Sequence, residues 1–135
     1  MAEIKTFNPE TIAKPGGQYS HVTRVKASEF LFIAGQVATD RNGALVGPGD
    51  IEAQCAQVYA NIGAALKSAG AGWSSVVQFT TFIVNAQDMP KLRNFRSREF
   101  PTMFPGGVYP PNTMLIIDRL AQEQYLIEVQ TIAAL

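Results

Sequence analysis

Hydrophobic residues between Ile51 and Ala69 recur at intervals of three and four, which is the spacing of one face of an α-helix. The stripe consists of Ile51, Cys55, Val58, Ile62, Leu66 and Ala69. Asp50 precedes it, where an aspartate side chain can cap the first turn, and Gly70 follows it, where glycine ends many helices. The pattern predicts an amphipathic helix that packs its apolar stripe against a core.

Residues 73–84 follow a different pattern and predict a central β-strand. They are dense in Val, Phe, Thr and Ile, which favour strands. The two-residue period places Gln78 and Thr80 on one side, with Val77, Phe79 and Ile83 on the other.

Two further regions predict β-hairpins. Residues 19–35 are β-branched and then apolar, with a polar break at 27–29. Residues 113–120 and 125–134 are two strand-like stretches joined by a short polar connection. We expect each region to form a pair of adjacent antiparallel strands.

A second helix is expected to begin near Asp88 and to carry Met89, Leu92 and Phe95 inward. It should end by Phe100, because a proline at position 101 disfavours helical geometry in the residue before it. Loops are expected at residues 40–48 and 101–111, where turn-forming Gly, Pro, Asn and Asp accumulate.

The predicted order is ββαβαββ in one α+β domain spanning residues 1–135. Two helices can cover only one face of the sheet, so the other face must meet water or a partner. Leu115 and Ile117 alternate with Met114 and Ile116, which makes both sides of that strand apolar. This pattern favours an oligomer.

Composition narrows the chemistry. Eleven basic and eleven acidic residues leave no net positive field for a nucleic acid. Cys55 and His21 are the only residues of their types, so we expect no disulfide within the chain, no metal site and no cofactor. No export signal or membrane-spanning stretch is visible, and we expect a cytoplasmic protein with no membrane partner.

Several familiar kinds of site are disfavoured by the sequence. No G-x-S-x-G pattern surrounds a serine, and the paired glycines lack the lysine and hydroxyl residue of a phosphate loop. Cys55 lies on the apolar stripe and has no visible cation to activate it. The cluster Arg93, Arg96 and Arg98 is interpreted as a solvated helix face rather than an anion site.

Polar residues at strand and loop positions are the remaining candidates. Glu128 and Gln130 share one side of the last strand, where they are either solvated edge residues or the wall of a pocket. Tyr19, Gln36, Asn94 and Asn112 lie in loops or at element ends, where ligand contacts are common. For Tyr19, Asn94 and Asn112 the alternatives are interface packing, a helix-surface amide and turn chemistry, respectively.

Four segments together resemble the RidA-like (YjgF/YER057c/UK114) family. They are FIAGQV at 32–37, VVQFTTFIV at 76–84, YPPNTMLIIDRL at 109–120 and LIEVQTIAAL at 126–135. The likeness extends over residues 16–135. It implies a chorismate-mutase-like fold of the bacillus type and a homotrimer whose sheets form a central barrel. Three clefts between subunits would each take a small-molecule ligand.

The resemblance also implies where this chain departs from the deaminase branch of the family. The arginine that clamps a substrate carboxylate there corresponds to Asn112, and the glutamate that places the attacking water corresponds to Gln130. Glu128 matches a glutamate that the family does not use in that role. The expected ligand-binding residues are Tyr19, Gly35, Gln36, Asn94, Asn112, Met114, Glu128 and Gln130.

Two functions follow as hypotheses. The first is hydrolysis of an enamine or imine to a carbonyl compound plus ammonia, on a non-standard substrate. A 2-imino acid is disfavoured, because each charge-assisted hydrogen bond lost with the guanidinium is worth about 1.5 to 3 kcal/mol. The alternative is a non-catalytic protein that binds a neutral or weakly polar metabolite. A ribonuclease ranks third, because the chain has one histidine and no net charge.

Overall fold

The segments richest in β-branched and aromatic residues form a four-stranded sheet in the computed structural model, which describes residues 1–135. The strands lie in the order β3–β6–β4–β5. Their bounds are β3 Phe30–Gln36, β4 Val76–Ile83, β5 Asn112–Ile116 and β6 Ile127–Ala134. β6 pairs antiparallel with β3 and β4, whereas β5 runs parallel to β4. The predicted central strand is confirmed for Val76–Ile83, whereas Trp73–Ser75 form a short 3-10 helix.

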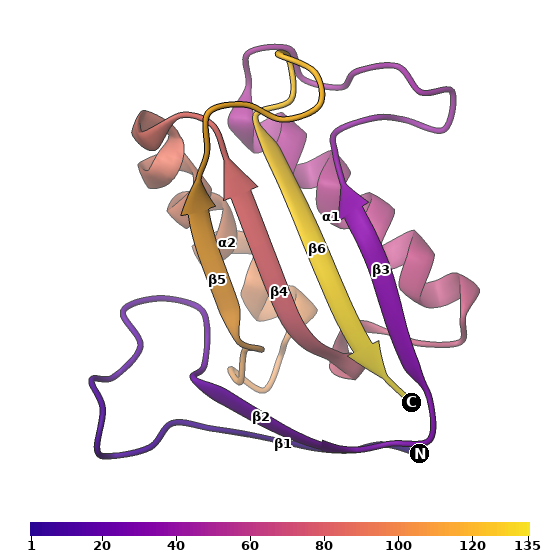
Figure 1. The fold of residues 1–135 in the computed structure, drawn as a ribbon, viewed down its shortest axis with the longest axis vertical. Helices are drawn as coiled ribbons and strands as arrows, with labels where there is room; N and C mark the ends of the chain where they lie inside the picture. Colours follow the sequence, from indigo (N-terminus) through magenta and orange to yellow (C-terminus); the bar gives the residue numbers. More distant parts are fainter.

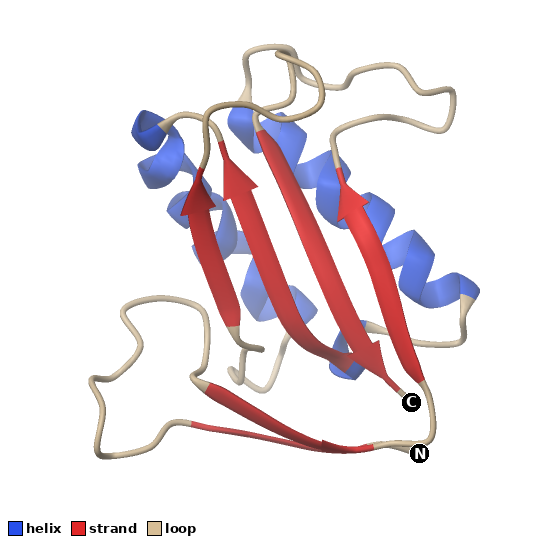
Figure 2. Ribbon diagram, viewed as in Figure 1, coloured by secondary structure: helices blue, strands red, loops and turns tan.

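Two helices, α1 (Ile51–Ser68) and α2 (Met89–Met103), cover one face of this sheet and leave the other face open (Figures 1 and 2). α1 begins as predicted, since the Asp50 carboxylate accepts a hydrogen bond from the Ala53 amide at 3.1 Å. Gly70 follows the end of α1 with a φ of +74°, a conformation that glycine adopts without strain. Neither helix is long and apolar enough to cross a membrane.

Both predicted hairpins are wrong. β2 (Val22–Lys26) pairs with β1 (Glu3–Phe7) instead of β3, and the two form a separate ribbon below the ends of the main strands (Figure 1). β1 is a strand that the sequence did not predict. Its alternating EIKTF segment lacks the dense apolar run that marks the other strands. β5 and β6 are not neighbours, since residues 117–126 pass over the end of β4 and bring β6 down on its far side.

The predicted end of the second helix is also wrong. α2 continues through Pro101 to Met103, and the Phe104 amide still donates to the Phe100 carbonyl at 2.7 Å. Pro101 removes one donor, but it does so in the last turn, where few hydrogen bonds remain to be lost. Phe100 is fully buried, so core packing holds the helical conformation that the following proline disfavours.

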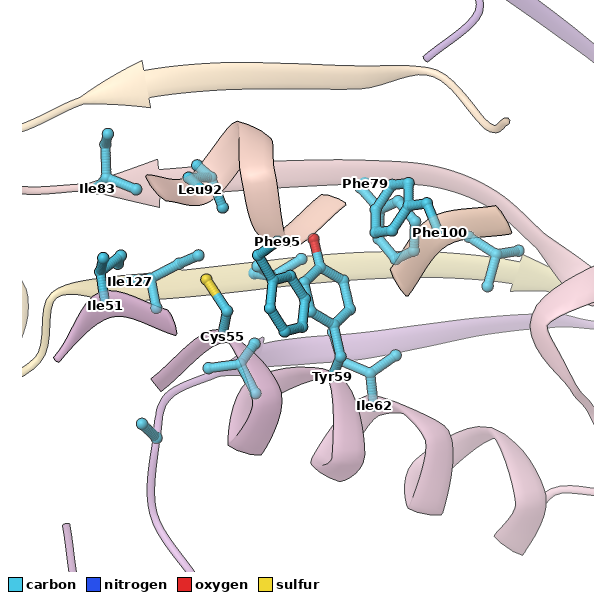
Figure 3. Close-up of a cluster of buried hydrophobic side chains, with 14 of the residues drawn as sticks. Ile51, Cys55, Tyr59, Ile62, Phe79, Ile83, Leu92, Phe95, Phe100 and Ile127 are labelled. Carbon is cyan, nitrogen blue, oxygen red and sulfur yellow. The ribbon is translucent and has the colours of Figure 1, made fainter. Parts of the chain in front are cut away.

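An aromatic cluster fills the space between the helices and the sheet (Figure 3). Tyr59 of α1 stacks on Phe95 of α2 with ring centroids 5.7 Å apart. It meets Phe100 edge-on at 5.5 Å and Phe79 of β4 edge-on at 6.0 Å. Such pairs add about 0.5 to 1.5 kcal/mol each beyond the area that they bury. The cluster therefore joins both helices and the central strand into one core.

Cys55 lies in the same core as a small hydrophobic residue. Burial raises the pKa of its thiol from 9.0 to about 12, and the Glu52 carboxylate acts in the same direction. The native state thus favours the protonated thiol. This contribution to stability is complete below pH 9 and is lost as the pH rises toward 12.

We expect iodoacetamide to leave native Cys55 unmodified at pH 8 and to modify it fully after unfolding in urea, as measured by mass spectrometry. The free energy of unfolding should fall as the pH rises above 9, because the unfolded thiol ionises first. A Cys55→Ala variant should show a shallower fall. Alkylation of the native protein at the rate of a free thiol would contradict this assignment.

Candidate functional site

A cavity of about 550 Å³ opens where the loop of residues 16–19 meets α2 and the edge strand β5. This size suits a small organic ligand. The lining residues are Gly16, Gly17, Gln18, Tyr19, Met89, Leu92, Arg93, Arg96, Ser97, Asn112, Thr113 and Met114. Three of the predicted ligand-binding residues, Tyr19, Asn112 and Met114, therefore lie on one cavity.

Asn112 is oriented by a neighbouring strand. β5 begins at this residue, opposite Phe79 of β4, and the Thr81 hydroxyl donates a hydrogen bond to Asn112 Oδ1 at 2.7 Å. Thr81 is buried, so its hydroxyl has few other partners. With its oxygen engaged, Asn112 retains its two N–H donors for a ligand.

Arg96 is a buried cation of this cavity, although the sequence predicted that it lies on a solvated helix face. The residue is 8% exposed, and its Nη2 donates to the Gln18 carbonyl at 2.6 Å. The guanidinium carbon lies 4.6 Å from the centre of the Phe100 ring, and Nε is buried without a hydrogen-bond partner. Desolvation lowers the pKa of this guanidinium.

The interpretation of the arginine cluster as a solvated face is wrong for Arg96 but holds for Arg98. Arg98 is exposed and pairs with Glu52 and Glu99 at 3.4 and 3.1 Å. The sequence did carry a signal, since Arg96 lies four residues from both Leu92 and Phe100, on the buried stripe of α2. A charge on an apolar stripe indicates a buried group.

Glu128 lies on the other side of the sheet, close to Gly35. A β-carbon at position 35 would lie 2.6 Å from Glu128 Oε2, so this carboxylate occupies the space that a side chain would take. The β3–β6 register also shifts between Ile33 and Gln36. The glycine and the irregular pairing together admit Glu128 against the backbone of β3.

The chain by itself does not bring the predicted site residues together. Tyr19, Asn112 and Met114 line the cavity on the helix-covered side. Glu128 and Gln130 alternate with the fully buried Ile127, Val129 and Thr131 of β6, and so belong to the open face. Gly35 and Gln36 end β3 beside β6. Asn94 is exposed on α2 and is not part of the cavity lining.

The single histidine has a local structural contact. His21 Nε2 lies 2.6 Å from the Ala13 carbonyl oxygen. The backbone amide of His21 donates to Asn8 Oδ1 at 2.8 Å. Its ring also meets Tyr19 edge-on, with centroids 5.8 Å apart. His21 therefore ties together the loop that supplies Tyr19 to the cavity.

Comparison with known proteins assigns the fold and the family. A family model described as endoribonuclease L-PSP matches residues 10–135. The chain belongs to the RidA-like (YjgF/YER057c/UK114) family. A RutC family protein of Synechocystis sp. is 32% identical to it over 133 residues, covering 98% of this chain and 97% of the relative.

Solved structures agree with this assignment. A protein of unknown function of the conserved Rid family from Yersinia pestis is 34% identical, with a TM-score of 0.86 and 98% of both chains covered. The predicted α+β fold is thus confirmed for this RidA-like chain, although the sheet of the single chain does not close into a barrel. The 2-iminobutanoate/2-iminopropanoate deaminase of Bos taurus is 28% identical over 89 residues, covering 66% of this chain and 64% of that enzyme.

Replacing Thr81 by valine tests how the amide of Asn112 is held. The change removes the hydroxyl donor while keeping the shape, so the free energy of unfolding should fall by about 1 kcal/mol, as measured by urea denaturation. Thr113→Val is the matched control, because Thr113 is exposed on β5 and makes no side-chain hydrogen bond to Asn112. Equal effects of the two changes would contradict this role.

Proposed function

We propose that this RidA-like protein binds a small metabolite in clefts formed between the subunits of a homotrimer. The observation that carries the proposal is the uncovered face of the sheet. Phe32 of β3 is 77% exposed on it, opposite Ile132 of β6, and Phe30 is also exposed. Burying a phenylalanine side chain is worth about 1.5 to 3 kcal/mol, so this face favours contact with other copies.

The division of the polar residues supports clefts between subunits. Tyr19 and Asn112 line the cavity on one side of the sheet, while Glu128 and Gln130 belong to the other side. We propose that the open face of one subunit completes the cavity of its neighbour. The Gln130 amide would then be added to the donors of Tyr19 and Asn112, while Glu128 stays packed against Gly35 of its own chain.

Binding is better supported than hydrolysis. Imine hydrolysis adds water to the C=N carbon, forms a carbonyl group and releases ammonia, and it needs a group that takes a proton from that water. The amide of Gln130 cannot act as this base. Hydrolysis remains a second candidate because the bovine relative is named 2-iminobutanoate/2-iminopropanoate deaminase.

Two further parts of the proposal concern partners and location. We propose that the protein does not bind nucleic acids. Its acidic and basic residues balance, and its single histidine, His21, makes a structural contact with the Ala13 carbonyl. We place the protein in the cytoplasm, where a lone buried cysteine such as Cys55 stays reduced.

A Phe32→Asp variant should lose its oligomeric state, because a carboxylate would replace an apolar ring on the face that subunits share. Light scattering after size-exclusion chromatography should give three chains for the native protein and one for the variant. Phe32→Leu, which keeps an apolar side chain, should remain trimeric. A native protein that elutes as a stable monomer would refute the proposed assembly.

Ammonia release from freshly generated 2-aminoacrylate separates binding from hydrolysis. We expect the native protein to match the uncatalysed rate, because Gln130 supplies no base. An Asn112→Arg/Gln130→Glu double variant should release ammonia faster, since it restores a cation and a carboxylate at the two positions. Native release well above the uncatalysed rate would instead place hydrolysis first.

A further inference from the structure

Arg96 is a buried cation without an acidic partner. Removing a charge from water is costly, and buried arginines are usually paired with a carboxylate. Here the guanidinium makes one hydrogen bond, to the neutral Gln18 carbonyl, and Nε has no partner. None of the twelve residues that line the cavity is an aspartate or a glutamate.

Two acids near α2 pair with a different arginine, and Asp88, which directly precedes α2, makes no salt bridge. Glu52 and Glu99 both pair with Arg98, which is exposed and outside the cavity. Arg93 also lines the cavity, about one turn of α2 before Arg96, and it makes no salt bridge. The cavity therefore has two cations on one wall and no anion of its own.

Contacts within the protein hold the guanidinium in place. The Gln18 carbonyl lies 2.6 Å from Nη2, and the Phe100 ring lies below the guanidinium carbon at 4.6 Å. The Gln18 side chain donates to the Ser97 hydroxyl at 3.2 Å, which fastens the loop of residues 16–19 to α2. A fixed guanidinium loses little entropy on binding an anion.

We propose that Arg96, assisted by Arg93, binds the anionic group of the ligand, a carboxylate or a phosphate. This inference rests on the proposed function, since it concerns the same cavity, and it names the ligand class as a small organic anion. Position 112 carries no cation, but α2 supplies one from another wall. The N–H donors of Asn112 would contact a second polar atom of the ligand.

The native protein provides the first test. Propanoate and propanamide have nearly the same shape and differ in charge, and inorganic phosphate serves as the third probe. Titrations followed by the backbone NMR signals of Gln18 and Ser97 should give an affinity for propanoate or phosphate at least about tenfold above that for propanamide. The tighter of the two anions identifies which group the site takes.

Variants then locate the anion. Arg96→Gln should weaken binding of the preferred anion at least about tenfold, and Arg93→Gln should weaken it less, because an exposed cation is screened by water. Arg98→Gln is the matched control on the same helix and should bind as the native protein does. If Arg96→Gln fails to fold, the comparison of acid and amide in the native protein still decides.

The outcomes separate this inference from the proposed function. Equal affinity for propanoate, propanamide and phosphate overturns the anion site but leaves a small-molecule cavity in a trimer. A trimer that binds none of the probes also overturns the anion site. A monomer that binds none of them removes both proposals. Full anion binding by Arg96→Gln, with loss in Arg98→Gln, would place the anion on the exposed face instead.

Discussion

The contact of Tyr59 with Phe79, Phe95 and Phe100 fixes both helices on one face of the sheet. Because one residue of α1 meets side chains from β4 and α2, neither helix can move to the opposite face without breaking the whole cluster. The other face, with Phe32 at its surface, is left without cover from its own chain. The exposed apolar surface of this face thus follows from the same packing that stabilises the fold.

Local sequence patterns predicted the helices and strands better than they predicted which strands pair with each other. The stripe of α1 and the composition of β4 depend on neighbouring residues, and both predictions are confirmed. Strand pairing depends on where the chain goes next, and a short polar connection does not reveal that β6 lies between β3 and β4. β1 has little apolar content of its own and gains its partner only when β2 is placed beside it.

The candidate site was predictable in part, for the same reason. Tyr19, Asn112 and Met114 meet at one cavity, although they come from a loop and a strand far apart in the sequence. Their separation from Glu128 and Gln130 follows from the two-residue period of β6, but its consequence appears only when the helices are assigned to one face. The charge of Arg96 suggests an exposed side chain like those of its neighbours, whereas its four-residue spacing from Phe100 indicates the buried stripe of the helix.

A buried charge is informative because it is costly to keep. A methionine or leucine in place of Arg96 would cover the Phe100 ring without desolvating a cation, and replacing buried ions with apolar residues often stabilises a protein. The hydrogen bond to the Gln18 carbonyl offsets only part of that cost, since Nε stays unpaired. An anion entering the cavity would supply the missing countercharge. Ligand binding would then stabilise the native fold, because it compensates a charge that no acidic side chain of the cavity pairs with.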